Sequence, residues 1–324
     1  GAFMSTGPRL PGIELIPVAP RASGWRDVAL LPGAVARARA DVFWSPYHKG
    51  PLWGGTPTVV SFHDLTFLHG ATAFAWRPYL AAVVRRARGV VCGSHAARRE
   101  VEAAFPAAAP KIEVIPYPVA GRFFSPVAPG VRVSVRQRLG LPDRYVLYVG
   151  NGRPHKNLPG LLKGFSGLPN ADRRGLGLAL VGLSDAEWRG LEPEVRRLGV
   201  HGSVRHLGRV PDDDLPACYA GAIAVALLSR AEGFGYPVLE AMACGTPVLA
   251  ADRGSLPEVS GGAAQLVDPD DQPAVVAALH RMLADRNLRA GLAARGRLRA
   301  AAFTEIRFMQ ALVDVLRKAA SRKG

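Results

Sequence analysis

The sequence of 324 residues is poor in cysteine and contains no long hydrophobic segment. Its three cysteines stand singly without a CxxC pair, which argues against a disulfide framework or a zinc ribbon and favours a reducing compartment. The longest run without a charged residue, 215–229, is too short to cross a membrane. The first ten residues, GAFMSTGPRL, lack the charged-then-apolar pattern of a signal peptide. We therefore expect a soluble, cytoplasmic protein.

Acidic residues are also scarce relative to basic ones, since 41 Lys and Arg face 26 Asp and Glu, for a net charge of +15. Arginine outnumbers lysine by about six to one and alanine is abundant, a pairing that is often the compositional habit of a whole proteome. The charge is equally compatible with phosphate-bearing ligands or an anionic membrane surface. No recognised nucleic-acid-binding motif accompanies it, so we expect no nucleic-acid partner.

Short apolar runs alternate with helical patterns along the whole chain. Continuous apolar strands separated by helices predict parallel sheets covered on both faces, which is a doubly wound α/β architecture. The expected strands are residues 13–18, 41–44, 56–62, 89–94, 111–116, 144–150, 177–182, 222–229, 246–252 and 263–268. The expected helices in the second half are residues 157–168, 186–199, 212–220, 237–244 and 271–284.

A segment rich in proline and glycine, PYPVAGRFFSPVAPG at 116–130, separates the two halves and leads into a short helix. We therefore predict two Rossmann-like domains, residues 1–125 and residues 126–302. The remaining residues, 303–324, are predicted to form an amphipathic helix that packs back towards the first domain. The first half has room for only four or five strands, and we expect it to lack an opening strand–loop–helix unit.

Two glutamates interrupt an otherwise apolar stretch, SRAEGFGYPVLEAMACGTPVLA, at positions 229–250. Proline favours the first position of a helix, so Pro237 predicts a helix that starts directly after the glycine-rich turn. The exposed amides at such a start bind anions, phosphate above all. Glu240 lies within this helix and Glu232 at the end of the preceding strand, and a buried carboxylate needs hydrogen-bond donors. Ribose or sugar hydroxyls would supply them, whereas the structural alternative is complementation of the helix dipole.

The stretch EGFGYPVLEAMACGTPV resembles the E-x7-E motif of retaining nucleotide-sugar glycosyltransferases of family 4, which have the GT-B fold: two Rossmann-like domains facing across a cleft. The resemblance covers roughly residues 40–320. It is also carried by YVLYVGNGRPHKNLPGLLKGF, by VRHLGRVPDDDLPACYAGAIAVALLSRAEGFG and by SLPEVSGGAAQLVDPDD. In the first half, TPTVVSFHDLTFL and GVVCGSHAARREV are similar to strands of the acceptor domain.

The resemblance implies a role for each matching residue. Glu232 would contact hydroxyls of the transferred sugar, and Glu240 would hold the ribose, so that the donors for both carboxylates come from the ligand. Lys156, helped by Arg153, would bind the diphosphate, and His63 would lie close to the donor sugar. Further donor-binding residues, mostly through their backbone, would be Gly150, Asn151, Gly152, Phe234, Gly235, Tyr236 and Val238.

Outside that resemblance, Asn157 and Asp64 are expected to cap the elements that follow them. The carboxylates at 212–214 are typical of the polar start of a helix and not of a metal site, and no D-x-D motif ends a strand. We therefore expect no metal and no cofactor, only a GDP- or UDP-linked sugar as co-substrate.

The family mechanism implied is transfer of a hexose, with mannose favoured, to a glycan or lipid-linked acceptor with retention of configuration. The basic, aromatic segment 66–89 is compatible with peripheral contact to an anionic membrane, or with an ordinary surface helix. Two other functions stay open. One is a non-transferring enzyme such as an epimerase. The other is a truncated or degenerate subunit that binds nucleotide sugar, or a partner, without transfer activity of its own.

Overall fold

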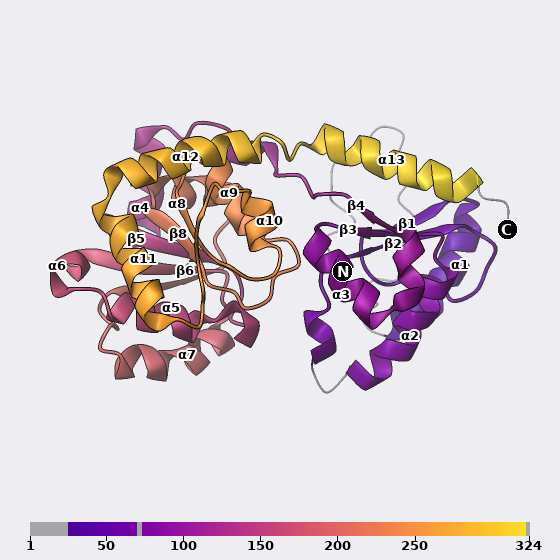
Figure 1. Ribbon diagram of the computed structural model, residues 1–324, viewed down its shortest axis with the longest axis horizontal. Coiled ribbons are helices and arrows are strands. Elements are labelled where there is room, and N and C mark those ends of the chain that lie inside the picture. The colour runs from indigo at the N-terminus through magenta and orange to yellow at the C-terminus, as the bar shows by residue number, and fades with distance from the viewer. Residues whose placement is uncertain (1–24, 70–72, 322–324) are drawn as a thin grey trace. The chain divides into compact units, whose positions relative to one another are not determined.

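The computed structural model describes residues 25–69 and 73–321, and the chain divides into two compact units (Figure 1). The first unit comprises Gly1–Ile115 and Met309–Gly324, and the second comprises Pro116–Phe308. The sequence-based boundaries, at 125 and 302, lie some residues away from these. The strand expected at 13–18 lies outside the described residues, as does the segment on which the prediction of a lacking opening unit depended.

The first unit contains a four-stranded parallel sheet in the order β1-β2-β3-β4. Its strands are β1 (Phe43–Ser45), β2 (Thr58–Phe62), β3 (Gly89–Cys92) and β4 (Ile112–Val114), and its other elements before residue 115 are α1 (Trp25–Ala38), η1 (Thr66–His69), α2 (Ala73–Arg86), α3 (His95–Ala104) and η2 (Pro106–Lys111). One face of the sheet packs Val60, Phe62 and Val90 against Leu80 and Val84 of α2. All residues of β2 are buried, which explains why the uninterrupted apolar run predicted this strand correctly.

The final helix, α13 (Glu305–Ser321), confirms the predicted amphipathic helix at the end of the chain. Its residues from Met309 onwards belong to the first unit. Gly89 lacks a side chain where Val315 of α13 passes, since a Cβ there would lie 3.3 Å from the valine. Arg88 donates to the carbonyl of Ala319 at 3.1 Å, and Lys318 pairs with Glu113 at 2.9 Å. The apolar stripe and two polar contacts therefore hold this part of α13 on the first unit's sheet.

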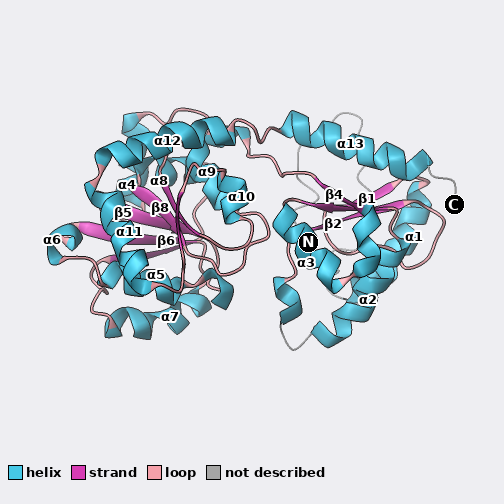
Figure 2. Ribbon diagram, viewed as in Figure 1, coloured by secondary structure: helices cyan, strands magenta, loops and turns pink. Residues whose placement is uncertain are grey.

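The second unit contains a six-stranded parallel sheet in the order β10-β9-β8-β5-β6-β7. Figure 2 distinguishes its strands from the helices around them by colour. Its strands are β5 (Arg144–Val149), β6 (Leu176–Val181), β7 (Val204–Gly208), β8 (Ala224–Leu227), β9 (Val248–Ala251) and β10 (Gln265–Val267). Its helices are η3 (Gly121–Phe123), α4 (Pro129–Arg138), η4 (Pro154–Lys156), α5 (Leu158–Ser166), α6 (Asn170–Arg173), α7 (Asp185–Arg197), α8 (Leu215–Gly221), α9 (Tyr236–Ala243), α10 (Leu256–Ser260), α11 (Gln272–Ala284) and α12 (Arg286–Ala300).

Alternate residues of the central strand β5 face the two layers of this sandwich. Tyr145 and Leu147 join the core beneath α4, α8, α9 and the end of α12. Val146 and Tyr148 join the core beneath α5, α7 and α11. The two cores explain why the strands have no polar face and were predicted as continuous apolar runs. The predicted doubly wound α/β class is therefore confirmed in the second unit.

Several elements were not predicted from the sequence, among them α1, α12 and β7. Strand β7 lies at the edge of the sheet and carries Arg205 and His206 with only Val204 buried, so it lacks the apolar run of an interior strand. Helix α12 buries few of its residues and is rich in arginine, so its sequence has only a weak hydrophobic periodicity. No helix within residues 25–69 and 73–321 combines the length and hydrophobicity that a bilayer crossing needs.

Candidate functional site

The two sequence motifs follow neighbouring strands of the second unit's sheet. Strand β5 pairs with β6 on one side and with β8 on the other. The loops that follow the carboxyl ends of β5 and β8 therefore lead away from each other, to opposite sides. Ligands of open parallel sheets bind at such a switch point. The backbone amide of Arg230 donates to the carbonyl of His155 at 2.8 Å and ties the two loops together. The structure therefore brings residues 150–157 and 229–240 to one site.

Lys156 and Glu232, one from each loop, form an ion pair at this site. The Lys156 Nζ lies 2.8 Å from Oε1 and 2.7 Å from Oε2 of Glu232. Both side chains are largely buried, with exposed fractions of 14% and 11%. The expectation that the donors for Glu232 come from a ligand alone is therefore wrong, because the protein supplies a bidentate cation. The reason is that a carboxylate and an ammonium group brought together away from water satisfy one another.

The backbone of Glu232 is held by the loop that precedes α10. The carbonyl of Glu232 accepts hydrogen bonds from the Ser255 amide at 3.1 Å and from the Ser255 hydroxyl at 2.9 Å. Gly254 has a positive φ of 60°, and a Cβ there would lie 2.9 Å from the same carbonyl oxygen. The close approach of this loop needs a glycine. Glu232 is thus fixed at both its backbone and its carboxylate.

Helix α9 begins at Tyr236, one residue before the predicted Pro237. Gly235 precedes it in the left-handed region, with φ of 91° and ψ of 49°, a conformation that glycine adopts readily. The expectation that the Val238 amide faces a ligand is not met in the described structure, because that amide donates to the Gly235 carbonyl at 3.0 Å and closes the first turn. The start of α9 otherwise has the orientation of an anion-binding helix end.

Glu240 lies on α9 and accepts a hydrogen bond from the Tyr219 hydroxyl at 2.7 Å, on Oε2. Burial raises the pKa of the Glu240 carboxyl, and the Tyr219 hydrogen bond and the charge of Arg122 oppose that rise. The prediction that only a ligand provides donors to Glu240 is therefore also wrong. Its second oxygen, Oε1, accepts no hydrogen bond from the part of the chain that the structure describes.

The loop after β5 is organised by a carboxylate that the sequence analysis did not select. Glu187 accepts from the Gly152 amide at 2.9 Å through Oε1, and its Oε2 accepts from both the amide and the hydroxyl of Ser184. The hydrogen bonds from Ser184 lower the pKa of Glu187. A Cβ at Gly152 would lie 2.7 Å from the Glu187 side chain, so the glycine admits the carboxylate. The Gly152 amide, expected to face a phosphate, is therefore engaged by Glu187.

The other residues of this loop also have protein partners. Gly150 has φ of 154°, and the carbonyl of Asn151 accepts from the buried Tyr148 hydroxyl at 2.7 Å. Asn157 occupies the N-cap position of α5 with φ of 55°, but its side chain makes no cap hydrogen bond. It donates instead to the carbonyl of Pro269 at 3.2 Å. The predicted cap at Asn157 is thus correct in position and wrong in its bond, because the left-handed backbone turns the amide towards Pro269.

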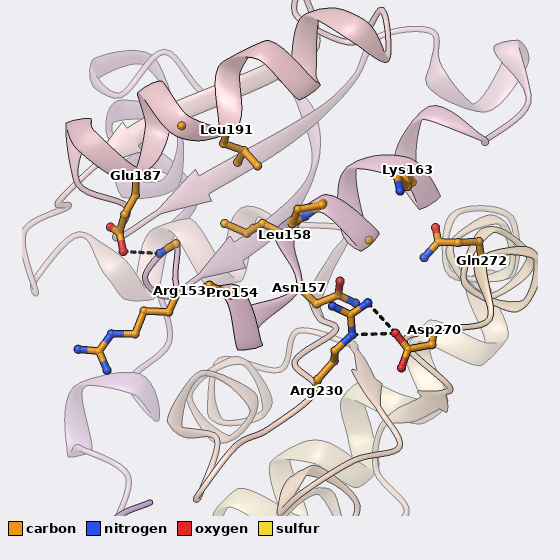
Figure 3. A pocket seen from close by; sticks show the side chains of 14 residues that line it. Arg153, Pro154, Asn157, Leu158, Lys163, Glu187, Leu191, Arg230, Asp270 and Gln272 are labelled. Atoms are coloured by element: carbon orange, nitrogen blue, oxygen red, sulfur yellow. Dashed lines mark hydrogen bonds and ion pairs between the residues drawn. The ribbon is translucent and has the colours of Figure 1, made fainter. Parts of the chain in front are cut away.

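Arg153 does not reach the Lys156–Glu232 pair but lines a separate surface pocket of about 760 Å³. Glu187, which accepts from the Gly152 amide, lies on one side of this pocket, and the ion pair of Arg230 with Asp270 lies on another (Figure 3). The pocket also contacts Leu158 and Leu191 and does not include Lys156, Glu232 or Glu240. We place the candidate site at those three residues, because they share the switch point and the start of α9.

His63 belongs to the first unit, whereas the other predicted site residues belong to the second. It directly follows β2, and its Nε2 lies 2.8 Å from the carbonyl oxygen of Pro46. Its ring meets that of Tyr47 edge to face, with centroids 5.8 Å apart. Asp64 caps the next turn as predicted, since its Oδ1 accepts from the Thr66 amide at 2.9 Å. The role of His63 towards a donor sugar stays a prediction.

The aromatic residues of the motif differ in exposure. Phe234 is buried and packs its ring against those of Tyr117 and Phe303. Tyr236 is 39% exposed and stacks on Tyr117 with an interplanar angle of 11°. The Phe234 side chain is therefore part of the core, whereas the Tyr236 side chain borders solvent. Within the described ranges, no group of three or more His, Cys, Asp or Glu side chains is placed to hold a metal ion.

Sequence reasoning missed Tyr219 and Glu187. Tyr219 lies within an apolar helix, where a tyrosine is typical of a core residue. Glu187 belongs to an S-x-x-E capping box, a signal that predicts the start of α7 but not the bond to Gly152. Both contacts join segments far apart in the sequence, so only the folded chain reveals them.

Comparison with known proteins identifies the family of this chain. The family model "Glycosyl transferases group 1" matches residues 134–299, and the model "Glycosyltransferase Family 4" matches residues 3–120. The O-antigen chain mannosyltransferase B of Escherichia coli is 39% identical over 186 residues, which are 56% of this chain and 48% of that protein. A D-inositol 3-phosphate glycosyltransferase of Salinispora arenicola is 36% identical over 231 residues, 66% of this chain and 51% of that protein. This chain thus matches about half the length of these curated relatives.

Among solved structures, Anabaena HepE in complex with UDP-glucose superposes with a TM-score of 0.71 at 23% identity, covering 81% of this chain and 72% of that one. This likeness concerns the fold, which is that of GT-B glycosyltransferases with two parallel-sheet α/β domains. The family model covering residues 134–299 includes the loops that carry Lys156, Glu232 and Glu240. The chain therefore belongs to the glycosyl transferases of group 1, in glycosyltransferase family 4.

Proposed function

We propose that this glycosyltransferase moves a hexose, with retention of its anomeric configuration, from a nucleotide-diphosphate sugar to a hydroxyl of a glycan or lipid-linked acceptor. The observation that carries the proposal is the Lys156–Glu232 ion pair at the switch point, from which the chain continues directly into α9 with Glu240. The donor we propose is a GDP- or UDP-linked sugar, with GDP-mannose favoured. The mannosyltransferase relative supports mannose, and the fold neighbour solved with UDP-glucose supports a nucleotide sugar.

In the proposed reaction the bond between the anomeric carbon and the diphosphate oxygen breaks, and a bond from that carbon to the acceptor oxygen forms. The acceptor's proton passes to the leaving diphosphate on the same face of the sugar. Negative charge that builds on the diphosphate would be stabilised by Lys156, by the amides at the start of α9 and by Arg153 after movement of its side chain. The family resemblance supports this metal-independent assignment.

Ligand binding in this scheme requires a rearrangement. Lys156 must turn from Glu232 towards the diphosphate, and Glu232 then receives sugar hydroxyls in its place. Glu240 would accept hydrogen bonds from the ribose through Oε1 while Oε2 stays with Tyr219. We also propose that the acceptor is presented at a membrane surface. The basic residues Arg85 and Arg86 of α2 and the exposed Phe74 support this.

The test of the donor site is binding of UDP, GDP, UDP-glucose and GDP-mannose to the whole chain, measured by thermal shift and calorimetry. Linkage predicts about 2.7 kcal/mol of stabilisation at a ligand concentration a hundred times its dissociation constant. We expect one base to be preferred and its stabilisation to be lost in Glu240→Ala. The matched control is Glu194→Ala, which removes a carboxylate paired with Arg197 on the surface of α7. No stabilisation by any of the four ligands would refute the proposal.

Transfer is tested separately from binding. The assay measures the nucleoside diphosphate that is released when the sugar is hydrolysed or transferred. It is run without an acceptor and with lipid-linked glycans or sugar phosphates as acceptors. Binding without turnover under all these conditions would favour the alternative function, a subunit that binds nucleotide sugar without transferring it.

A further inference from the structure

Tyr219 is held in place through both its backbone and its side chain. Its ring is fully buried and meets Phe123 edge to face, with centroids 5.8 Å apart. Its carbonyl accepts from the Thr246 hydroxyl at 2.8 Å, which links α8 to the segment after α9. Its own hydroxyl donates to Oε2 of Glu240 at 2.7 Å. The phenol is therefore a fixed donor, and it is aimed at one oxygen of a residue in the candidate site.

The carboxylate of Glu240 stands in surroundings that disfavour its charge. Burial raises the pKa of Glu240, and the negative charge of Asp212, which precedes α8, acts in the same direction. The charge of Arg122 in η3 and the hydrogen bond from Tyr219 both lower the pKa of Glu240 and so oppose this rise. The remaining titratable groups that face the carboxylate are Tyr236 and Cys244, at the two ends of α9.

A carboxylate whose two oxygens have different partners can be oriented by one and bind through the other. Tyr219 occupies Oε2, and Oε1 accepts nothing from the described residues. A phenol that donates to a carboxylate stabilises the ionised form and restricts its rotation. Ribose hydroxyls donate more strongly to an ionised carboxylate than to a neutral carboxylic acid, so the ionised form of Glu240 binds them better.

We propose that Tyr219 is a positioning residue for nucleotide binding: its hydroxyl keeps Glu240 ionised and directs Oε1 towards the ribose hydroxyls of the donor. The proposal rests on the proposed function, in which Glu240 holds the ribose. A tyrosine that served only to fill the core would contribute through its ring, and phenylalanine would replace it at this site with a loss of stability alone.

The experiment compares Tyr219→Phe with the wild-type chain in calorimetric titrations with the preferred nucleoside diphosphate, UDP or GDP, between pH 5 and pH 8. We expect the affinity at neutral pH to fall about tenfold, since hydrogen bonds to charged groups are stronger than neutral ones. We also expect the acid limb of the affinity profile to move to higher pH. The sign follows because loss of the donor destabilises the carboxylate, so that Glu240 takes up its proton earlier as the pH falls.

The matched control is Tyr145→Phe, which removes another buried phenol, one that donates to the Cys218 carbonyl at 2.7 Å and not to Glu240. This control should lower the stability of the chain, while the acid limb of its affinity profile should lie at the same pH as in the wild type. If Tyr219→Phe weakens binding equally at every pH, or binds as wild type does, the positioning role is overturned while the nucleotide site stands. If the wild-type chain binds neither nucleotide, the proposed function fails and this inference fails with it.

A second variant covers the case in which Tyr219→Phe does not fold. Glu240→Gln keeps an acceptor for the Tyr219 hydroxyl and removes the titrating group, so its residual affinity should no longer depend on pH in the acid limb. An acid limb that persists unchanged in Glu240→Gln would show that another group sets it and would overturn the inference.

Discussion

The ion pair of Lys156 and Glu232 should be far stronger than the other pairs of the second unit, because its side chains are only 14% and 11% exposed. An exposed pair contributes about 0–1 kcal/mol, whereas removing one partner of a buried pair costs about 3–5 kcal/mol. The Lys156–Glu232 pair is largely but not fully buried, so we expect Glu232→Gln and Lys156→Met each to lower the free energy of unfolding by about 2–3 kcal/mol.

A double-mutant cycle isolates the interaction between the two side chains. The double variant leaves no unpaired charge, so it should cost little more than either single change, and the coupling free energy should be about 2 kcal/mol. The assay is equilibrium unfolding of the whole chain in urea. The control cycle is Arg253→Met with Asp268→Asn, a pair whose side chains are 42% and 47% exposed, for which we expect less than about 1 kcal/mol. A coupling at Lys156–Glu232 no larger than that of the control would refute the reasoning from burial.

The same variant separates two kinds of ligand. In Glu232→Gln, Lys156 no longer has to leave a carboxylate before it can bind a diphosphate, so UDP or GDP should bind as tightly as to wild type or more tightly. A nucleotide sugar should lose affinity relative to the nucleoside diphosphate, because the acceptor of the sugar hydroxyls is weakened. Calorimetric titration of both ligands gives the comparison. Equal loss for both would contradict the proposed division of roles between Lys156 and Glu232.

Three further predictions concern single residues. Glu240→Gln should stabilise the ligand-free chain at pH 7 by about 1 kcal/mol while weakening nucleotide binding. Because burial raises the pKa of Glu240, its destabilising effect is absent below the ordinary value of about 4.3, grows between that value and the raised folded value, and is complete above it. Thermal denaturation should therefore show no advantage for the variant below about pH 4.3 and its full advantage at neutral pH. Gly235→Ala should cost about 2 kcal/mol in urea unfolding, since φ is 91° and the new Cβ would lie 2.7 Å from Leu256. Asn157→Ala should lower the free energy of unfolding by about 2 kcal/mol and Asn157→Gly by about 1 kcal/mol. Both variants lose the hydrogen bond to Pro269, but of the two only glycine adopts the φ of 55° without strain. Equal losses in urea unfolding would refute the backbone contribution.

The sequence alone predicted most of the interior of the second unit. Strands such as β5 and β6 are buried on both faces, so their apolar runs needed no tertiary information to be recognised. The edge strand β7 was missed for the complementary reason, since one open side lets it carry arginine and histidine. The order in which strands adjoin, and with it the switch point, is a property of the folded sheet that these runs do not encode locally.

The sequence also determined which residues occupy the candidate site, because the glycines, the proline and the two glutamates of residues 232–240 form a local pattern. What those carboxylates contact was decided by the tertiary structure. Glu232 finds Lys156, which is 76 positions away, and Glu240 finds Tyr219, which is 21 positions away. A buried charge must be satisfied by whichever donor the fold brings within reach, and that choice depends on the crossing of loops and helices in space. The local motif thus identifies the residues of the site, whereas their hydrogen-bond partners depend on how the strands, loops and helices pack in the folded chain.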